Sequence, residues 1–455
     1  MDTMLKFIKH KYNNLISDTK FSEILSGSVW VLSAQILAAA LGLISSIIIA
    51  RLYGVELLGI VAVLDSFLIL ATIFTVLGTN ISILRLIPEH LVKYSPTSAF
   101  RLYRKSQYMA IGVSVMSGTL FFLGSNMIAD KLFTKPHLSF YFSLAAGFVV
   151  FRSLMLLNTQ AVRSLKLMRA FAFMEVLPYA VNLILLILLG IFLNTRNVPV
   201  YAFLIGFALT GMMGLIIVEN AFKKRILPND PVHPMPVKDI LSISLPMLMT
   251  AAMYFVLGQT GVIMLGIFNS EAEVGYYAAA VKLATSTMFV LQAVNSIAAP
   301  KFSELFHSGN IDELFHVAKK SAKLIFWATT PICIGLMVFG RPMLTIMFGH
   351  DFAVGYPALL FLVLGQFVNA VSGATGLFMN MTGNQKVFKN ILLITAMANI
   401  GFNLFFIPRL GIHGAALSGM VSLALWNIIT LIYIKSKFGM TIGYLPGMSL
   451  LKKPR

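Results

Sequence analysis

Long apolar stretches separated by short polar segments run through almost the whole chain. A helix that crosses a bilayer needs about 20 mostly apolar residues. Twelve stretches meet this length, at residues 24–50, 55–80, 107–129, 138–161, 172–194, 198–221, 238–267, 275–299, 321–345, 353–381, 387–407 and 412–434. The pattern therefore predicts an all-α integral membrane protein with twelve transmembrane helices.

The longest break between apolar stretches falls near the middle, at residues 222–237. Its sequence, FKKRILPNDPVHPMPV, holds four prolines and a basic cluster, which oppose a continuous helix. We interpret it as a cytoplasmic linker between an N-terminal six-helix lobe, 24–221, and a C-terminal six-helix lobe, 238–434. Outside the lobes we expect a cytoplasmic N-terminal segment, 1–23, and a basic cytoplasmic tail, 435–455.

The two halves show weak internal similarity. Gly59 and Gly275 each follow the first loop of a half, and a cation follows each glycine by 26 residues, Arg85 and Lys301. Six spans per half is an even number, so both halves insert in the same orientation. We therefore expect two pseudo-symmetric lobes around a central cavity.

Lysine and arginine alternate between successive connecting segments. Odd-numbered segments, termini and adjoining span ends included, hold 27 of the 35 basic residues, and even-numbered segments hold 6. This positive-inside pattern predicts that both termini lie in the cytoplasm. The net charge of +18 then reflects attraction to anionic lipid headgroups, and nucleic acid is not an expected partner.

Two cations, Arg152 and Lys282, lie inside apolar stretches. A central Arg costs at least about 2.5–3.5 kcal/mol on insertion scales, so Arg152 should face water, an anion or an acidic partner. Lys282 lies nearer the outer side, where its long stem can also reach the interface. A functional role and a structural ion pair are both open for Arg152, as are a functional and an interfacial role for Lys282.

Asp65 is the one carboxylate well inside a predicted span. It stands six residues after Gly59, and Lys282 stands seven after Gly275, so the two have matching depths in pseudo-symmetric halves. We hypothesise that they pair when the lobes close on the outer side and separate when they open, which makes Asp65 a candidate coupling or gating group. The alternative is that Asp65 reaches the outer interface by itself. Glu175, near a cytoplasmic span end, is interpreted as interfacial.

Polar and small residues form stripes within several apolar stretches. In the tenth they recur at spacings of 3, 4, 3 and 4, which predicts one helical face holding Gln366, Asn369, Gly373, Gly376 and Asn380. The first and eleventh stretches carry shorter stripes, made of Ser28, Gln35, Gly42 and Ser46, and of Asn399 and Asn403. Close helix packing explains any single stripe. Several stripes together with buried cations favour a hydrated central cavity.

No HExxH, GxSxG, Walker loop or CxxC pair occurs in the sequence. Only 11% of residues are charged and 58% are hydrophobic, so twelve spans leave no room for a soluble catalytic domain. We therefore expect neither an enzyme nor a bound cofactor or metal. A membrane-embedded glycosyltransferase or polymerase is a distant alternative, because the predicted outer loops are too short to shape a catalytic pocket.

The stretch SVWVLSAQILAAALGLISSIIIARLYGVELLGIVAVLDSF resembles the opening of Wzx-type polysaccharide flippases of the multidrug/oligosaccharidyl-lipid/polysaccharide (MOP) exporter superfamily. RLIPEH, LGQFVNAVSGATGLFMNMTGNQKVFKN and GIHGAALSG fit later parts of these proteins, so the resemblance covers most of the chain. It implies a MATE-like fold in the bacterial cytoplasmic (inner) membrane. It also implies a flippase that moves undecaprenyl-pyrophosphate-linked oligosaccharide units by alternating access, for surface polysaccharide such as O-antigen.

The implied substrate suggests roles for the candidate residues. A cavity cation such as Arg152 or Lys282 would offset the desolvation of pyrophosphate, and Arg suits bidentate phosphate contact. Arg51, Arg85 and Lys301 lie at span ends, where they either recruit the headgroup or anchor to ordinary phospholipid. The polar side chains expected in the cavity are Gln35, Gln366, Asn369 and Asn380.

Rival functions come from the same superfamily. MATE-type multidrug or cation antiporters typically couple through a carboxylate in the first span, which this chain lacks, and lipid II flippases typically have two further spans. Both are kept as alternatives, and coupling to a proton or sodium gradient is left open. Besides the lipid-linked glycan and the bilayer, the implied partners are a polysaccharide polymerase and a chain-length regulator.

Overall fold

The computed structural model describes residues 19–227 and 230–446, with side chains from Trp30 onward, and these residues are almost entirely helical. The first half of the chain forms α2 (Thr19–Ile48), η1 (Ile49–Tyr53), α3 (Val55–Thr75), α4 (Thr79–Lys93), α5 (Pro96–Met127), η2 (Ile128–Leu132), α6 (Leu138–Ala146), α7 (Val149–Ser164), α8 (Met168–Phe192) and α9 (Val198–Lys223). The second half forms α10 (Val237–Phe268), α11 (Glu271–Thr285), α12 (Met288–His307), α13 (Ile311–Phe348), η3 (His350–Gly355), α14 (Tyr356–Ser372), α15 (Thr375–Met381), α16 (Gln385–Leu410) and α17 (Ile412–Phe438). Most of the predicted N-terminal segment and the end of the basic tail lie outside the described residues.

The helices confirm a multi-pass membrane protein. Ten spans are long and apolar enough to cross a bilayer, and the number rises to twelve if each of two bent helix pairs is one span. The bent pairs are α6 with α7, at 49°, and α11 with α12, at 42°. A helix satisfies its own backbone hydrogen bonds, which is why apolar stretches of this length fold as helices in lipid. The predicted number of spans therefore agrees with the structure.

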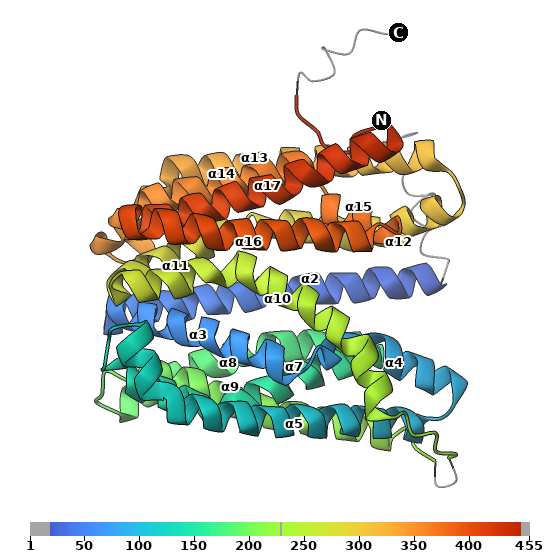
Figure 1. The fold of residues 1–455 in the computed structure, drawn as a ribbon, viewed down its shortest axis with the longest axis horizontal. Helices are drawn as coiled ribbons and strands as arrows, with labels where there is room; N and C mark the ends of the chain where they lie inside the picture. Colours follow the sequence, from blue (N-terminus) through green and yellow to red (C-terminus); the bar gives the residue numbers. More distant parts are fainter. Residues whose placement is uncertain (1–18, 228–229, 447–455) are drawn as a thin grey trace, which may run out of the picture.

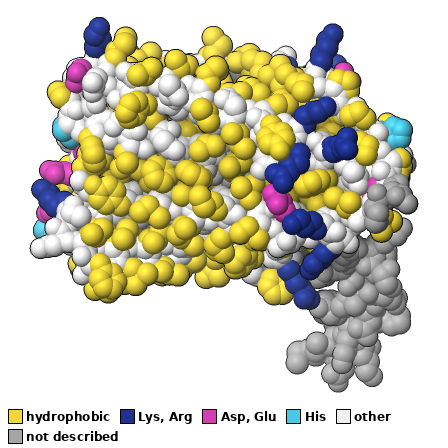
Figure 2. All heavy atoms as spheres, turned by 90° about the horizontal axis from the view of Figure 1, so that it is seen from below, with side chains coloured by type: hydrophobic (Ala, Val, Ile, Leu, Met, Phe, Trp, Pro, Cys, Tyr) yellow, Lys and Arg dark blue, Asp and Glu magenta, His cyan; other side chains and the backbone are white. Residues whose placement is uncertain are grey.

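The two halves form separate layers of the bundle. Helices α2 to α9 lie in the lower part of Figure 1 and α11 to α17 in the upper part, while α10 runs obliquely across the lower part, from the lower right up to the boundary beside α11. Apolar side chains dominate the middle of the lower face in Figure 2, and Lys and Arg gather toward one end of it. That end also holds the start of α5 and the end of α9, which the charge pattern predicts to face the cytoplasm. The opposite end, with the connections 51–54, 133–137 and 269–271, is hereafter the outer end.

The predicted tenth span is interrupted, so its polar stripe does not lie on one helix. Gly373 has a φ of +73°, a conformation that L side chains rarely adopt, and α14 ends just before it. A Cβ on Gly373 would lie 2.6 Å from the Cβ of Ala322 on α13, so the chain turns where α13 packs closest. The expected single face through Gln366 and Asn380 was therefore wrong, because the two residues belong to different helices, α14 and α15.

Candidate functional site

A cavity of about 550 Å³ lies between the two halves of the bundle. Its walls come from α2, α3, α7, α8 and α9 of the first half and from α10 and α11 of the second. Most of the lining is apolar, but it holds a set of charged side chains: Asp65, Arg152, Glu175 and Lys282. Charged groups inside a membrane domain are rare and face the bundle interior or a water-filled space. This cavity is therefore the candidate functional site.

Arg152 lies in the first turn of α7, just after the bend that separates α6 from α7. Its Nη1 donates to Asp65 Oδ1 on α3 at 2.6 Å, and its guanidinium carbon lies 4.5 Å from the ring centre of Phe207. The Arg152 side chain is 13% exposed and that of Asp65 is 40% exposed, and both line the cavity. The guanidinium is thus paired with an acid and also borders an open space, which combines the two interpretations of the sequence.

Lys282 lies in the last turn of α11, where the negative end of the helix dipole favours a cation. Its ammonium donates to the Gly42 carbonyl at 3.0 Å and to the Ser46 hydroxyl, both on α2. These acceptors are neutral, so the Lys282 charge has no carboxylate partner among the described residues. The hypothesised pair of Asp65 with Lys282 is not formed here, because Asp65 is held by Arg152 within its own half.

Sequence reasoning missed several polar side chains of the cavity, and Glu175 and Gln259 are two of them. Glu175 on α8 lines it and is therefore not interfacial as interpreted, because the cavity extends to this level of α8. Gln259 on α10 also lines it, and its Oε1 accepts a hydrogen bond from Ser66 on α3 at 2.8 Å. The only sequence signal for either residue was a polar group inside an apolar stretch.

The cavity is closed at the outer end by a close crossing of α3 and α11. A Cβ on Gly59 would lie 1.9 Å from the Glu271 carbonyl oxygen, and one on Gly275 would lie 2.3 Å from the Val55 carbonyl oxygen. The crossing is reciprocal, since each glycine packs on the backbone of the helix that carries the other. The two glycines that the weak sequence repeat singles out therefore meet at one contact between the halves.

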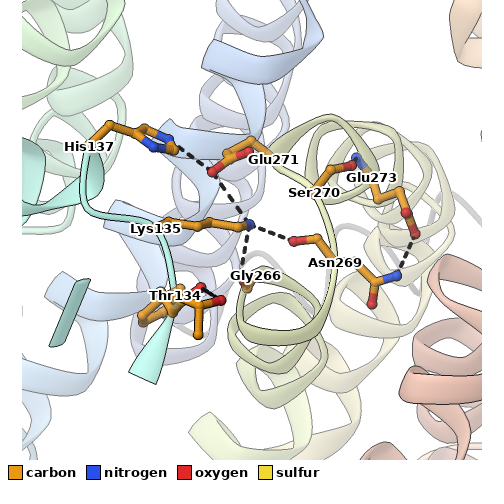
Figure 3. A network of polar contacts seen from close by, with 9 residues as sticks. Thr134, Lys135, His137, Gly266, Asn269, Ser270, Glu271 and Glu273 are labelled. Atoms are coloured by element: carbon orange, nitrogen blue, oxygen red, sulfur yellow. Dashed lines mark hydrogen bonds and ion pairs between the residues drawn. The ribbon is translucent and has the colours of Figure 1, made fainter. Parts of the chain in front are cut away.

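Polar contacts reinforce this closure (Figure 3). Lys135, which precedes α6, donates to the carbonyls of Gly266, at 3.0 Å, and Asn269, and its Nζ lies 3.4 Å from Glu271 Oε1. His137 Nε2 lies 3.1 Å from the same Glu271 oxygen. The loop before α6 is thus joined to the connection between α10 and α11.

Arg51 forms a second contact between the halves at the outer end. Its Nε donates to the Met347 carbonyl at 2.9 Å, and its Nη2 donates to the Ile346 carbonyl, both near the end of α13. The last four carbonyls of a helix have no hydrogen-bond partner within the helix, and Arg51 supplies donors to two of them at the end of α13. In this structure Arg51 therefore joins η1 to α13 and does not line the cavity.

Several other predicted site residues also lie away from the cavity. Arg85 and Lys301 are exposed on α4 and α12, 3.9 Å from Glu89 and 3.0 Å from Glu304 respectively. Asn369 is buried between helices and accepts a hydrogen bond from Asn427 of α17 at 3.1 Å, so it serves packing. The remaining polar candidates are outside the cavity lining: Gln35, Gln366 and Asn380.

Comparison with known proteins gives a family and two curated relatives. A family model described as polysaccharide biosynthesis protein matches residues 48–357. A probable low-salt glycan biosynthesis flippase of Haloferax volcanii is 22% identical over 245 residues, which cover 54% of this chain and 50% of the relative. An uncharacterized membrane protein of Methanocaldococcus jannaschii is 24% identical over 206 residues, covering 45% and 41%. The chain therefore spans about half the length of the curated relatives it matches.

Solved structures with the same fold are flippases and transporters. A lipid II flippase, MurJ, in an inward closed conformation gives a TM-score of 0.69 at 15% identity, covering 90% of this chain and 87% of that one. An inward-facing multidrug resistance MATE transporter of the MOP superfamily gives 0.65 at 16% identity, covering 90% and 98%. At such identities the likeness shows the fold, which is that of the MOP superfamily. Together with the family match over more than half of its residues, this places the chain in the polysaccharide biosynthesis protein family.

Proposed function

We propose that this protein is a flippase that moves undecaprenyl-pyrophosphate-linked oligosaccharide units across the cytoplasmic membrane by alternating access. The family and the flippase among its relatives support a lipid-linked glycan as substrate. The observation that carries the proposal is the cation Lys282, which has no carboxylate partner in the described part of the chain and lies in a cavity between two halves that meet at the outer end. Pyrophosphate is the part of the substrate that such a cation would bind.

The charges of the cavity favour an anionic ligand near α11. Arg152 is already paired with Asp65, whereas Lys282 has no direct ion pair among the described residues and contacts neutral acceptors. Guanidinium donors of Arg152 other than Nη1 have no partner among the described residues, so they add further hydrogen bonds for phosphate oxygens. The glycan would occupy the cavity, while the lipid chain stays in the bilayer.

The proposal is tested by flipping assays on the full chain in liposomes. A fluorescent undecaprenyl-pyrophosphate oligosaccharide is the substrate, and a reagent that cannot cross the bilayer quenches only molecules in the outer leaflet. The wild type should make all of the label accessible. Lys282→Met should slow flipping at least about tenfold, the size of losing a hydrogen bond to a charged group, and Lys282→Arg should retain most of the rate. A Lys282→Met protein that flips at the wild-type rate would refute the assigned role.

Asp65 is the proposed coupling group, to a proton or to sodium. When a substrate phosphate engages Arg152, the Asp65 carboxylate loses its partner and can accept a cation instead. Flipping should then respond to an imposed proton or sodium gradient in the wild type, and Asp65→Asn should abolish the response. An identical gradient response in Asp65→Asn would exclude this residue as the coupling group.

A cation antiporter is the second candidate, because Glu175 adds a carboxylate to the cavity. Such a protein would expel ethidium from cells, and Glu175→Gln would remove this activity. The same liposomes test the third candidate, a lipid II flippase, by replacing the oligosaccharide substrate with lipid II. Transport of ethidium or lipid II, without flipping of the oligosaccharide lipid, would overturn the main proposal.

A further inference from the structure

On the wall of the cavity, the charged side chain of Lys282 reaches from one half to the other. Lys282 belongs to α11 in the second half, and its ammonium bonds to the Gly42 carbonyl and the Ser46 hydroxyl of α2 in the first half. The Ser46 hydroxyl also donates to the Gly42 carbonyl, at 2.9 Å. Ammonium, hydroxyl and carbonyl thus form a closed triangle, hereafter the α2–α11 tie.

The tie uses two of the three hydrogen-bond donors of the Lys282 ammonium and gives it no carboxylate partner among the described residues. The ion pair in the cavity joins Asp65 to Arg152 at 2.6 Å, and the acceptors that Lys282 has among the described residues are neutral. The hydrogen bonds of the tie are charge-assisted through the ammonium alone, whereas a phosphate oxygen would add the attraction of an opposite charge. A phosphate oxygen in the cavity is therefore a better acceptor for the ammonium than α2 is.

The position of the tie connects it to the closure of the outer end. Ser46 lies in the last turn of α2, which continues through η1 into α3, and α3 crosses α11 at Gly59 and Gly275. A bond from α2 to α11 therefore holds the same pair of chain segments that closes the cavity. Separation of the halves at this end requires that Lys282 leave Gly42 and Ser46.

We propose that the α2–α11 tie keeps the outer end closed, and that the phosphate of a lipid-linked substrate releases it by taking over the Lys282 ammonium. The inference rests on the proposed function for the identity of the ligand. Its consequence is that opening depends on loading. An empty carrier stays tied, whereas a carrier that holds a prenyl diphosphate is free to open outward.

The test measures the width of the outer end in the full chain, in lipid nanodiscs. The single native cysteine is replaced by Cys333→Ala, and spin labels are placed on Leu193→Cys and Val354→Cys, exposed positions near the outer end in the first and second halves. Ser46→Ala removes one arm of the tie. Ser45→Ala is the matched control, because Ser45 is buried on the same helix, lines the same cavity and has no hydrogen-bond partner among the described residues.

Without ligand, Ser46→Ala should raise the ratio of open to closed molecules roughly tenfold, as expected for losing a hydrogen bond to a charged group. Ser45→Ala should match the wild type. Farnesyl diphosphate should open the wild type, whereas farnesol, which lacks phosphate, should not. Inorganic pyrophosphate tests whether phosphate alone is enough or the lipid chain is needed. Lys282→Met should be open without ligand and should not respond to farnesyl diphosphate.

A closed Ser46→Ala protein, with distances equal to those of Ser45→Ala, would overturn the tie. A wild type that binds farnesyl diphosphate in a direct binding measurement but stays closed would overturn release by phosphate. A wild type that does not bind it at all would instead count against the proposed substrate. In that case the distances in the ligand-free Ser46→Ala protein still test the tie. Failure of the tie and failure of the proposed substrate are therefore distinguishable.

Discussion

Replacing Gly59 by alanine should stop the two halves from closing at the outer end. A Cβ at this position would lie 1.9 Å from the Glu271 carbonyl oxygen, a backbone atom that cannot rotate away. Close carbon–oxygen contacts in proteins begin near about 3.3 Å, so α3 and α11 would have to separate by about 1.4 Å. In Gly275→Ala the new Cβ would lie 2.3 Å from the Val55 carbonyl oxygen, so the two helices would have to separate by about 1.0 Å.

The energetic cost follows from the packing. Adding a methyl group to a well-packed interior typically costs about 1–3 kcal/mol. Gly59 is buried and its neighbour is helix backbone, so we expect the upper end of this range. A cost of about 3 kcal/mol, borne only by the closed conformation, lowers the ratio of closed to open molecules about 150-fold. Gly275→Ala should have a smaller effect in the same direction.

The assay is the distance between labels at Leu193 and Val354 in the full chain. Gly59→Ala should show mainly the longer distance without ligand. The control is Gly258→Ala in α10, where an added Cβ has no atom within 4 Å and the helix should gain up to about 1 kcal/mol. A Gly59→Ala protein with the same closed population as Gly258→Ala would refute the conclusion that this crossing closes the cavity.

Two further substitutions test the packing of other parts of the fold by thermal unfolding. Lys135→Met removes the bonds to two carbonyls and to a carboxylate at the outer end and should lower the free energy of unfolding by about 1–3 kcal/mol, whereas Lys131→Met, exposed on η2, should change it little. Equal melting temperatures for the two variants would exclude a stabilising role for Lys135. Gly373→Ala should cost about 1–3 kcal/mol more than Gly383→Ala, because both glycines have a φ of +73° but only Gly373 has a neighbouring side chain within 4 Å. Similar losses for both would mean that backbone strain alone matters there.

The spans and their number could be predicted because they depend on the local sequence and not on contacts between distant segments. In lipid an apolar stretch of about 20 residues has helix as its available fold, whatever its neighbours are. Gly59 and Gly275, which meet where α3 crosses α11, could also be picked out, because each follows the first loop of its half in the sequence. The break at Gly373 could not, because a glycine within an apolar run fits both a helix and a turn. What decided it was the approach of Ala322 from a distant segment.

The candidate site was only partly predictable, for a geometric reason. The sequence gives the depth of a residue along its helix but not the direction in which its side chain points around the bundle. Asp65 and Lys282 have similar predicted depths and do line one cavity, yet Asp65 pairs with Arg152, which α7 brings to it from the same half. The position of Glu175 near a span end predicts an interfacial side chain, whereas the cavity reaches down to its level.

The contacts of the oblique helix α10 indicate which helices move together when the two halves move relative to each other. In sequence it follows the linker and belongs to the second half, yet Ser244 bonds to Ser82 at 2.7 Å and Gln259 to Ser66 at 2.8 Å, both in the first half. Toward α16 it packs without side-chain hydrogen bonds among the residues that the structure describes. When the bundle rocks, α10 should travel with the helices that precede it and slide along those that follow. The mechanical joint then falls after Phe268, one whole helix later than the proline-rich linker.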